Sequence, residues 1–324
     1  MEIYVKKAII HQFSPDDTDL YLADKFLNIT PKIEEYLRKK IERVYSDEAQ
    51  TGIFEEDNPF LEMISDDLLE TSVAVANRWK EEFVISENQK TNDLVFIQFS
   101  KEGVDHFAFL RIALRETLTH LGGDVDNPIK LTQNNLPGFG TGADEALVIN
   151  LQSRKYHLIE KRIKYNGTFL NYFSENLLQS QPKISPKKSI KALEKTAQRI
   201  AESFNTDDFQ FQSKVKSAIF NHIEEENKLS PEKLADDLFD DNLTARLSFI
   251  DQLKEAIPEP VTFEEIDASR QLKKFENQKL SLSNGIELIV PNSVYEDAES
   301  VEFILNDNGT YSILIKNIED IQSK

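Results

Sequence analysis

Cationic side chains that recur along one predicted helix carry the most specific chemistry in this sequence. Six of them follow one another around residue 190: Lys183, Lys187, Lys188, Lys191, Lys195 and Arg199. The last four are spaced 3, 4 and 4 residues apart, which places them on one face of a helix. The first two extend the positive charge toward the start of that helix, where the helix dipole also favours phosphate. The pattern predicts a DNA-binding face that contacts phosphates without reading bases.

The same cations also have an ordinary structural interpretation. A charged outer face is typical of any amphipathic helix, and the residues between the cations form an apolar stripe: Ile190, Leu193, Ala197 and Ile200. Basic clusters at 154–164 and 32–43 are interpreted in the same way. In this interpretation the charges at 154–164 protect an exposed strand against pairing with another strand edge. The positive charge at 32–43 is reduced by glutamates on the same helix.

The overall charge of the chain limits any contact with nucleic acid. The formal net charge is −19 and the sequence pI is near 4.8. Non-specific affinity for DNA comes mostly from lysine and arginine side chains that displace counterions from the phosphates. This chain therefore needs a local basic patch or a protein intermediary to reach DNA, or it makes no DNA contact.

Catalytic and metal-binding motifs are not found in the sequence. The chain has no cysteine, and its five histidines show no ligand spacing. The glycine-rich stretch 138–142 lacks the lysine of a phosphate-binding Walker loop and the context of a dinucleotide fingerprint, so it is interpreted as a flexible loop. We expect no catalytic residues, no metal and no cofactor, and a protein that is not an enzyme. Acidic clusters keep a metal-dependent hydrolase open as an alternative.

The first half of the chain predicts strands grouped with helices. Strands are expected at 3–13, 20–22, 93–100, 104–118, 146–151 and 156–165. Helices are expected after Thr30-Pro31 and from Pro59 to Phe83. Because the strands follow one another after the helices, the fold class is α+β with a mostly antiparallel sheet, not a doubly wound parallel sheet.

The second half predicts a helical segment and then a small β-hairpin unit. Helices are expected from Thr168, after Ser185-Pro186, at 207–226, after Ser230-Pro231 and at 244–256. Two hairpins follow, at 279–290 and 301–315, and the Asn284-Gly285 pair of the first is typical of a type I′ turn. Two hairpins are marginal alone, so we expect them to pack on neighbouring elements.

Three domains follow from this order of elements. They are an α+β domain at 1–166, a helical domain at 167–257 and a C-terminal β unit at 258–324, and Pro258-Glu259-Pro260 is the best linker candidate. The chain start lacks a secretory signal, and no apolar stretch is long enough to span a bilayer. The predicted location is the cytoplasm.

The order of several local strings resembles one known family almost from end to end. The strings include Lys7-Ala8-Ile9-Ile10-His11, Leu147-Val148-Ile149-Asn150-Leu151, Asn171-Tyr172-Phe173-Ser174 and Leu229-Ser230-Pro231, and the stretch from Val301 to Ile318. They resemble the bacterial nucleoid-associated protein family of the NdpA type. The resemblance implies a cytoplasmic protein found with the nucleoid, and it supplies no catalytic motif to place on this chain.

Two functions from different classes are compatible with these observations. In the first, the chain is a non-enzymatic nucleoid-associated protein that binds DNA through the local basic face. In the second, it is an acidic interaction protein, or a mimic of DNA, that regulates a DNA-processing enzyme. The partner is therefore DNA or a nucleoid protein, with no membrane contact, and self-association into a homo-oligomer stays open.

Overall fold

The computed structural model divides the chain into two compact units, Met1–Ser185 and Pro186–Lys324. It describes residues 2–322 except 17, 88, 121–128, 206–208, 259–260 and 264–268. The linker candidate Pro258-Glu259-Pro260 lies partly outside the described residues, because only Pro258 is among them. Each unit is described by itself.

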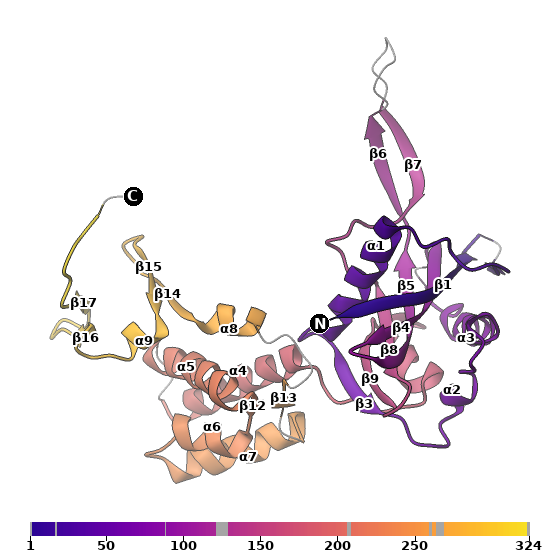
Figure 1. The fold of residues 1–324 in the computed structure, drawn as a ribbon. Coiled ribbons are helices and arrows are strands. Elements are labelled where there is room, and N and C mark those ends of the chain that lie inside the picture. Colours follow the sequence, from indigo (N-terminus) through magenta and orange to yellow (C-terminus); the bar gives the residue numbers. More distant parts are fainter. Residues whose placement is uncertain are drawn as a thin grey trace. The chain divides into compact units, whose positions relative to one another are not determined.

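The first unit is built on a seven-stranded sheet in the order β2-β1-β4-β5-β8-β9-β3, in which every neighbouring pair is antiparallel (Figure 1). The strands are β1 (Ile3–Ser14), β2 (Asp19–Tyr21), β3 (Gln50–Ile53), β4 (Asn92–Lys101), β5 (Val104–Ala113), β8 (Glu145–Asn150) and β9 (Lys155–Ile159). The predicted α+β class with a mostly antiparallel sheet is confirmed.

Both faces of this sheet are buried, and β4 shows why. Its side chains alternate between the faces and are apolar on both, so each face needs a cover. On one face Val95 and Ile97 share a core with residues of α1 (Pro31–Glu42), and on the other Leu94 and Phe96 share a core with residues of α3 (Leu68–Phe83). Burial of each such side chain stabilises the fold by about 1.5–3 kcal/mol.

The helices of the first unit begin at side-chain caps. Thr30 caps α1 through the N–H of Ile33, with Pro31 at the first helical position, as the sequence predicts. The helix predicted from Pro59 to Phe83 is present but interrupted. The chain forms α2 (Pro59–Glu62), breaks, and starts α3 at the Asp67 cap, whose carboxylate accepts the N–H of Leu69. A 3₁₀ turn, η1 (Arg43–Tyr45), follows α1.

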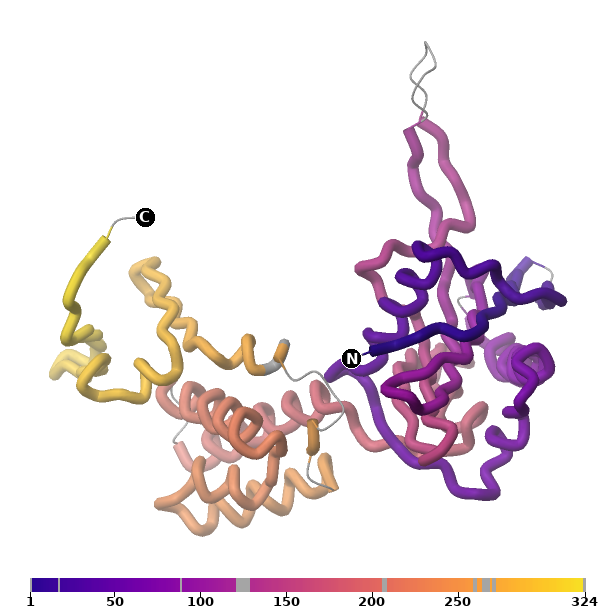
Figure 2. The backbone as a smooth tube through the Cα atoms, viewed as in Figure 1, coloured from indigo at the N-terminus to yellow at the C-terminus, as the bar shows by residue number. Residues whose placement is uncertain are grey.

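A two-stranded ribbon projects from the first unit (Figure 2). The single strand predicted at 104–118 is wrong, since β5 ends at Ala113 and β6 (Arg115–His120) leaves the sheet to pair with β7 (Ile129–Asn135), which the sequence did not predict. One face of the ribbon is exposed and apolar: Leu118, Ile129 and Leu131.

A second small hairpin replaces the helix that we predicted from Thr168. The strand predicted at 156–165 divides into β9 and β10 (Ile163–Tyr165), and β10 pairs with β11 (Thr168–Leu170). Asn166 and Gly167 both have positive φ at the turn, as a type I′ turn requires. The helical segment is only the one-turn π-helix η2 (Phe173–Leu177), whose Phe173 and Leu177 enter the sheet core.

The second unit contains a helical core. Its helices are α4 (Pro186–Ser203), α5 (Phe209–Glu226), α6 (Pro231–Leu238), α7 (Leu243–Ala256) and α8 (Ser269–Phe275). Two short strands, β12 (Lys228–Leu229) and β13 (Val261–Thr262), pair antiparallel. The apolar stripe predicted for α4 is buried there with residues of all four other helices. The sequence did not predict α8.

Two hairpins follow the helices and pack on α5. They are β14 (Asn277–Ser281) with β15 (Glu287–Pro291) and β16 (Val301–Leu305) with β17 (Tyr311–Ile315), separated by α9 (Asn292–Tyr295). The Gln278 side chain donates to the Ser213 carbonyl of α5 at 3.1 Å. The type I′ turn predicted at Asn284-Gly285 is wrong, because Gly285 has positive φ (+87°) and Asn284 does not.

The structure divides the chain at 185/186, whereas we predicted boundaries at 166/167 and 257/258. Phe173 and Leu178 lie in the core of the first unit, which holds the segment up to residue 185. Phe263 and Phe275 lie in the same core as the helices of the second unit. Among the described residues, no helix is long and apolar enough to cross a membrane.

A buried histidine makes the stability of the first unit depend on pH. The Nδ1 atom of His11 accepts the N–H of Ala23 at 3.0 Å, so Nε2 carries the proton and donates to the Ser72 hydroxyl at 2.9 Å. Burial lowers the pKa of His11 to about 4. The unfolded chain therefore binds a proton below pH 6.5 that the folded chain does not bind until about pH 4.

We expect the free energy of unfolding of the first unit to fall by about 3 kcal/mol between pH 6.5 and pH 4 from this group. The fluorescence of Trp79, the one tryptophan of the chain, reports urea unfolding of this unit. The His11→Asn variant should lose this part of the pH dependence. An equal slope in the variant and the parent would contradict the assignment.

Candidate nucleic-acid interface

The basic face of α4 exists as a continuous exposed surface. Because Ile190, Leu193 and Ile200 point into the helical core, the opposite side of α4 faces solvent. Four predicted cations are exposed there: Lys188, Lys191, Lys195 and Arg199. At a rise of about 1.5 Å per residue, they span about 16 Å along the helix axis. We call these four residues the α4 face.

The α4 face carries little compensating negative charge. Within the part of the chain that the structure describes, none of its four side chains forms an ion pair or a hydrogen bond. Glu194 lies beside the face and is half-buried, with Lys274 at 3.9 Å. Glu202 is exposed at the end of the face, where it accepts from Gln198 at 3.1 Å. The face is therefore strongly positive in a chain of net charge −19.

The two remaining predicted cations lie elsewhere. Lys187 is half-buried in the first turn of α4. Lys183 belongs to the first unit, where its backbone N–H donates to the Thr51 carbonyl at 2.7 Å and its side chain is exposed. The structure thus gathers four of the six predicted residues on one face.

The 154–164 cluster is largely neutralised by neighbouring carboxylates, and the 32–43 cluster only in part. In the 154–164 cluster, three cations form ion pairs: Arg154 with Glu56 at 2.9 Å, Lys161 with Asp144 at 2.6 Å and Lys164 with Glu87 at 3.2 Å. On α1, Arg38 pairs with Glu42 at 2.8 Å. A cation that is already paired contributes little to phosphate binding, so the 154–164 cluster is a poorer candidate than the α4 face. On α1, Lys32 and Arg43 form no ion pair among the described residues, but Glu34 and Glu35 of the same helix dilute their charge.

Lys40 of α1 holds the glycine-rich loop in place. Its side chain is buried, and its ammonium donates to the carbonyls of Gly138 at 2.9 Å, of Pro137 at 3.4 Å and of Thr141. Burial lowers the pKa of Lys40 to about 8. The loop turns carbonyl oxygens toward a cation, whereas a phosphate loop presents N–H groups to an anion. The geometry of residues 137–141 therefore does not fit a phosphate-binding loop.

A buried polar network lies within the first unit. Arg111 of β5 pairs with Glu145 of β8 at 2.6 Å, and the two side chains are 9% and 0% exposed. The guanidinium also donates to Asn92 at 2.8 Å, and the Tyr172 hydroxyl donates to the Glu145 carboxylate. Burial and the nearby Glu145 carboxylate raise the pKa of Tyr172 well above its usual value. Every charge is compensated inside the network, which indicates a structural role.

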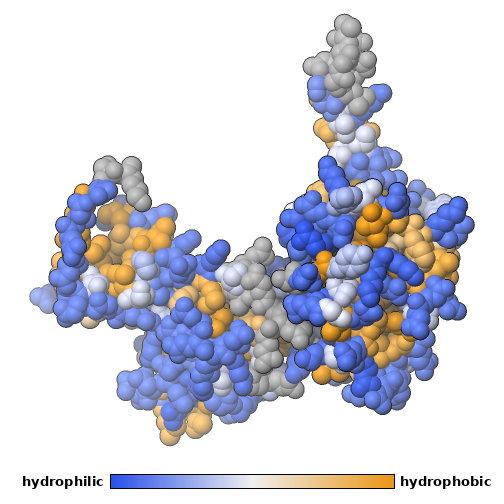
Figure 3. Space-filling model, viewed as in Figure 1, coloured by the Kyte–Doolittle hydropathy of each residue, from blue (hydrophilic) through white to orange (hydrophobic). Residues whose placement is uncertain are grey.

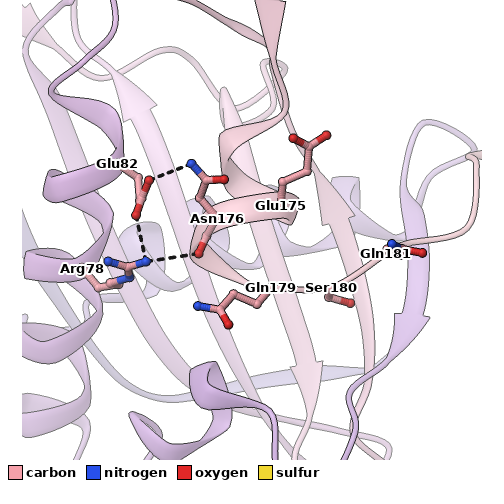
Figure 4. A pocket seen from close by; sticks show the side chains of 7 residues that line it. All are labelled: Arg78, Glu82, Glu175, Asn176, Gln179, Ser180 and Gln181. Atoms are coloured by element: carbon pink, nitrogen blue, oxygen red, sulfur yellow. Dashed lines mark hydrogen bonds and ion pairs between the residues drawn. The ribbon is translucent and has the colours of Figure 1, made fainter.

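A polar hollow of about 760 Å³ is lined by α3, by η2 and by the segment that follows η2 (Figure 4). Its one cation, Arg78, is held by Glu82 at 2.8 Å and by Glu81 at 3.0 Å. Asn176 contacts both groups, because its side-chain amide donates to Glu82 at 2.9 Å and its backbone carbonyl accepts from Arg78 at 3.4 Å. Among the described residues that line it, the hollow offers no unpaired cation to an anionic ligand. Among the described residues, no group of three His, Asp or Glu side chains is placed to hold a metal ion.

The family of the chain follows from a comparison with known proteins. No curated protein matches it. The family model described as nucleoid-associated protein YejK matches residues 9–321, nearly the whole chain, so the chain belongs to this family of nucleoid-associated proteins.

Proposed function

We propose that this nucleoid-associated protein is a non-enzymatic protein that binds duplex DNA directly through the α4 face, with Lys187 adding charge in the first turn of α4. The observation that carries the proposal is the set of four exposed cations with no carboxylate partner among the described residues. Each can exchange hydration for a phosphate contact without first breaking an ion pair. Three cations of the 154–164 cluster lack this property, because each already has a carboxylate partner.

The dimensions of the face favour contact with one stretch of DNA backbone. A span of about 16 Å corresponds to about five base-pair steps at 3.4 Å per step. Lysine and arginine side chains on one helix face can reach phosphates without entering a groove, which predicts binding with little sequence preference. The large negative charge of the rest of the chain keeps DNA from binding elsewhere.

The salt dependence of binding tests the proposal. Four phosphate contacts predict that log K falls with log salt at a slope of about −3.6 for duplex DNA. Affinity should then drop about 150-fold between 50 and 200 mM salt. Fluorescence anisotropy of a labelled duplex with purified protein measures both values. A slope near zero would contradict phosphate binding by this face.

The large negative charge favours a second function, in which the chain acts on a DNA-processing enzyme as an acidic partner or a mimic of DNA. It predicts that the purified protein does not retain DNA at any salt concentration. It also predicts that a DNA-processing enzyme copurifies with the protein. Retention of DNA by the purified chain separates the two functions.

A further inference from the structure

An apolar groove lies in the second unit between the two hairpins and α5. It has a volume of about 860 Å³ and is lined by both hairpins and by residues of α5 that include Phe209. The Phe209 ring packs edge-on against Phe303 and Tyr311, with ring centroids 5.1 Å and 5.2 Å apart. Figure 3 shows hydrophobic surface lining this hollow, in the region where Figure 1 places β14 to β17.

The groove exposes several large apolar side chains to water beside its polar ones. Among its lining residues, Ile286, Tyr311 and Ile315 are 51%, 52% and 49% exposed. Among the described strands, β14 pairs only with β15 and β17 only with β16, so each hairpin keeps an unpaired edge. An exposed apolar face with open strand edges is typical of an interaction surface.

Two cations line the groove without a partner. Lys216 of α5 and Lys279 of β14 are both lining residues, and neither forms an ion pair among the described residues. An occupant that complements the groove therefore combines apolar side chains with two negative charges.

The chain itself carries a segment of this composition. Residues 316–322 follow β17 without regular secondary structure, and they contain the sequence Ile318-Glu319-Asp320-Ile321. Ile318 and Ile321 are 51% and 81% exposed. Neither acidic residue forms an ion pair within the described part of the chain. The segment thus supplies two uncovered apolar side chains and two carboxylates that have no cationic partner among the described residues, although Asp320 accepts from the Gln322 amide at 2.8 Å.

We propose that residues 316–322 of one copy dock in the groove of a second copy, with Glu319 and Asp320 paired to Lys216 and Lys279. Because each copy has one groove and one segment, the exchange is reciprocal and closes a twofold dimer. The isoleucines leave water for the apolar floor, and the carboxylates meet the two ammonium groups at its rim.

Sedimentation equilibrium of the full chain without DNA tests this dimer. The parent chain should be dimeric, and the I318E/I321E variant should be monomeric because glutamates cannot enter an apolar floor. The K216E/K279E variant should weaken the dimer at least about tenfold through like-charge repulsion. Both pairs of substituted residues are at least partly exposed, so the thermal midpoint by circular dichroism should stay that of the parent.

A charge swap makes the test specific. Adding E319K/D320K to K216E/K279E restores opposite charges, so the fourfold variant should dimerise within about threefold of the parent. The control K228E/K273E, which changes the charge equally at exposed lysines outside the groove, should remain dimeric. A parent chain that is monomeric at about 0.1 mM, or a charge swap that restores nothing, would overturn the proposal.

The two proposals fail independently. The triple variant K188E/K191E/K195E alters only α4 and should remain dimeric while it loses DNA. A dimer that forms normally but does not retain DNA would remove the DNA-binding proposal and leave the exchange of residues 316–322 intact.

Discussion

Replacement of Lys188, Lys191 and Lys195 by glutamate is expected to lower the affinity for duplex DNA by at least about 500-fold at 0.1 M salt. Each phosphate contact contributes about 0.9 units of log K per tenfold change in salt concentration. Between 1 M and 0.1 M salt, three contacts therefore contribute about 2.7 units of log K, which the variant loses. Glutamate adds repulsion to this loss. The salt slope should shrink toward about −0.9, the value for Arg199 alone. Fluorescence anisotropy measures both changes.

Two control variants separate a local face from overall charge. K25E/K32E/K90E makes the same change in net charge at exposed lysines of the first unit and should leave the affinity within about threefold of the parent. K188R/K191R/K195R keeps the cations and should retain binding. Equal losses in the two glutamate variants would show that net charge, and not the α4 face, governs retention.

The second large effect is expected in the core of the first unit. The Glu145→Gln variant removes the charge that compensates Arg111, and both side chains are almost fully buried. An uncompensated buried charge lowers the free energy of unfolding by about 3–5 kcal/mol. Trp79 lies beside this network, since its indole N–H donates to the Tyr172 hydroxyl at 3.0 Å. Its fluorescence during urea unfolding reports the loss.

A double variant and a surface pair give the matched controls. R111M/E145M replaces both charges with apolar side chains and should be more stable than Glu145→Gln, because no charge is left unpaired. Lys164→Gln breaks the exposed pair with Glu87 and should have a much smaller effect, because water screens that pair. If Glu145→Gln and Lys164→Gln had equal effects, the buried pair would not stabilise the fold as proposed.

Local patterns predicted the elements that depend on nearby residues. The alternating apolar side chains at 301–315 predicted both strands of the last hairpin at their observed bounds. The spacing of the cations predicted the α4 face, because helix periodicity alone decides which side chains share a side. The Asn166-Gly167 pair was an available signal for the hairpin of β10 and β11, and the apolar spacing after Thr168 concealed it.

Features that depend on distant residues could not be predicted. Arg111 and Glu145 become neighbours only through the register of β5 with β8. Lys40 looked like one cation of a charged helix, and its burial arises from loop carbonyls 97 to 101 positions later in the sequence. The sequence also could not show that Arg154 and Lys164 are neutralised. Their partners, Glu56 and Glu87, lie far from them in the sequence.

Lysine footprinting by mass spectrometry measures most directly whether DNA covers the α4 face. The parent protein is acetylated briefly with and without a saturating duplex, and the modification of each lysine is compared. We predict that DNA slows acetylation of Lys188, Lys191 and Lys195 and leaves Lys25 and Lys90 unchanged. DNA retention with no protection of the three α4 lysines would contradict the account.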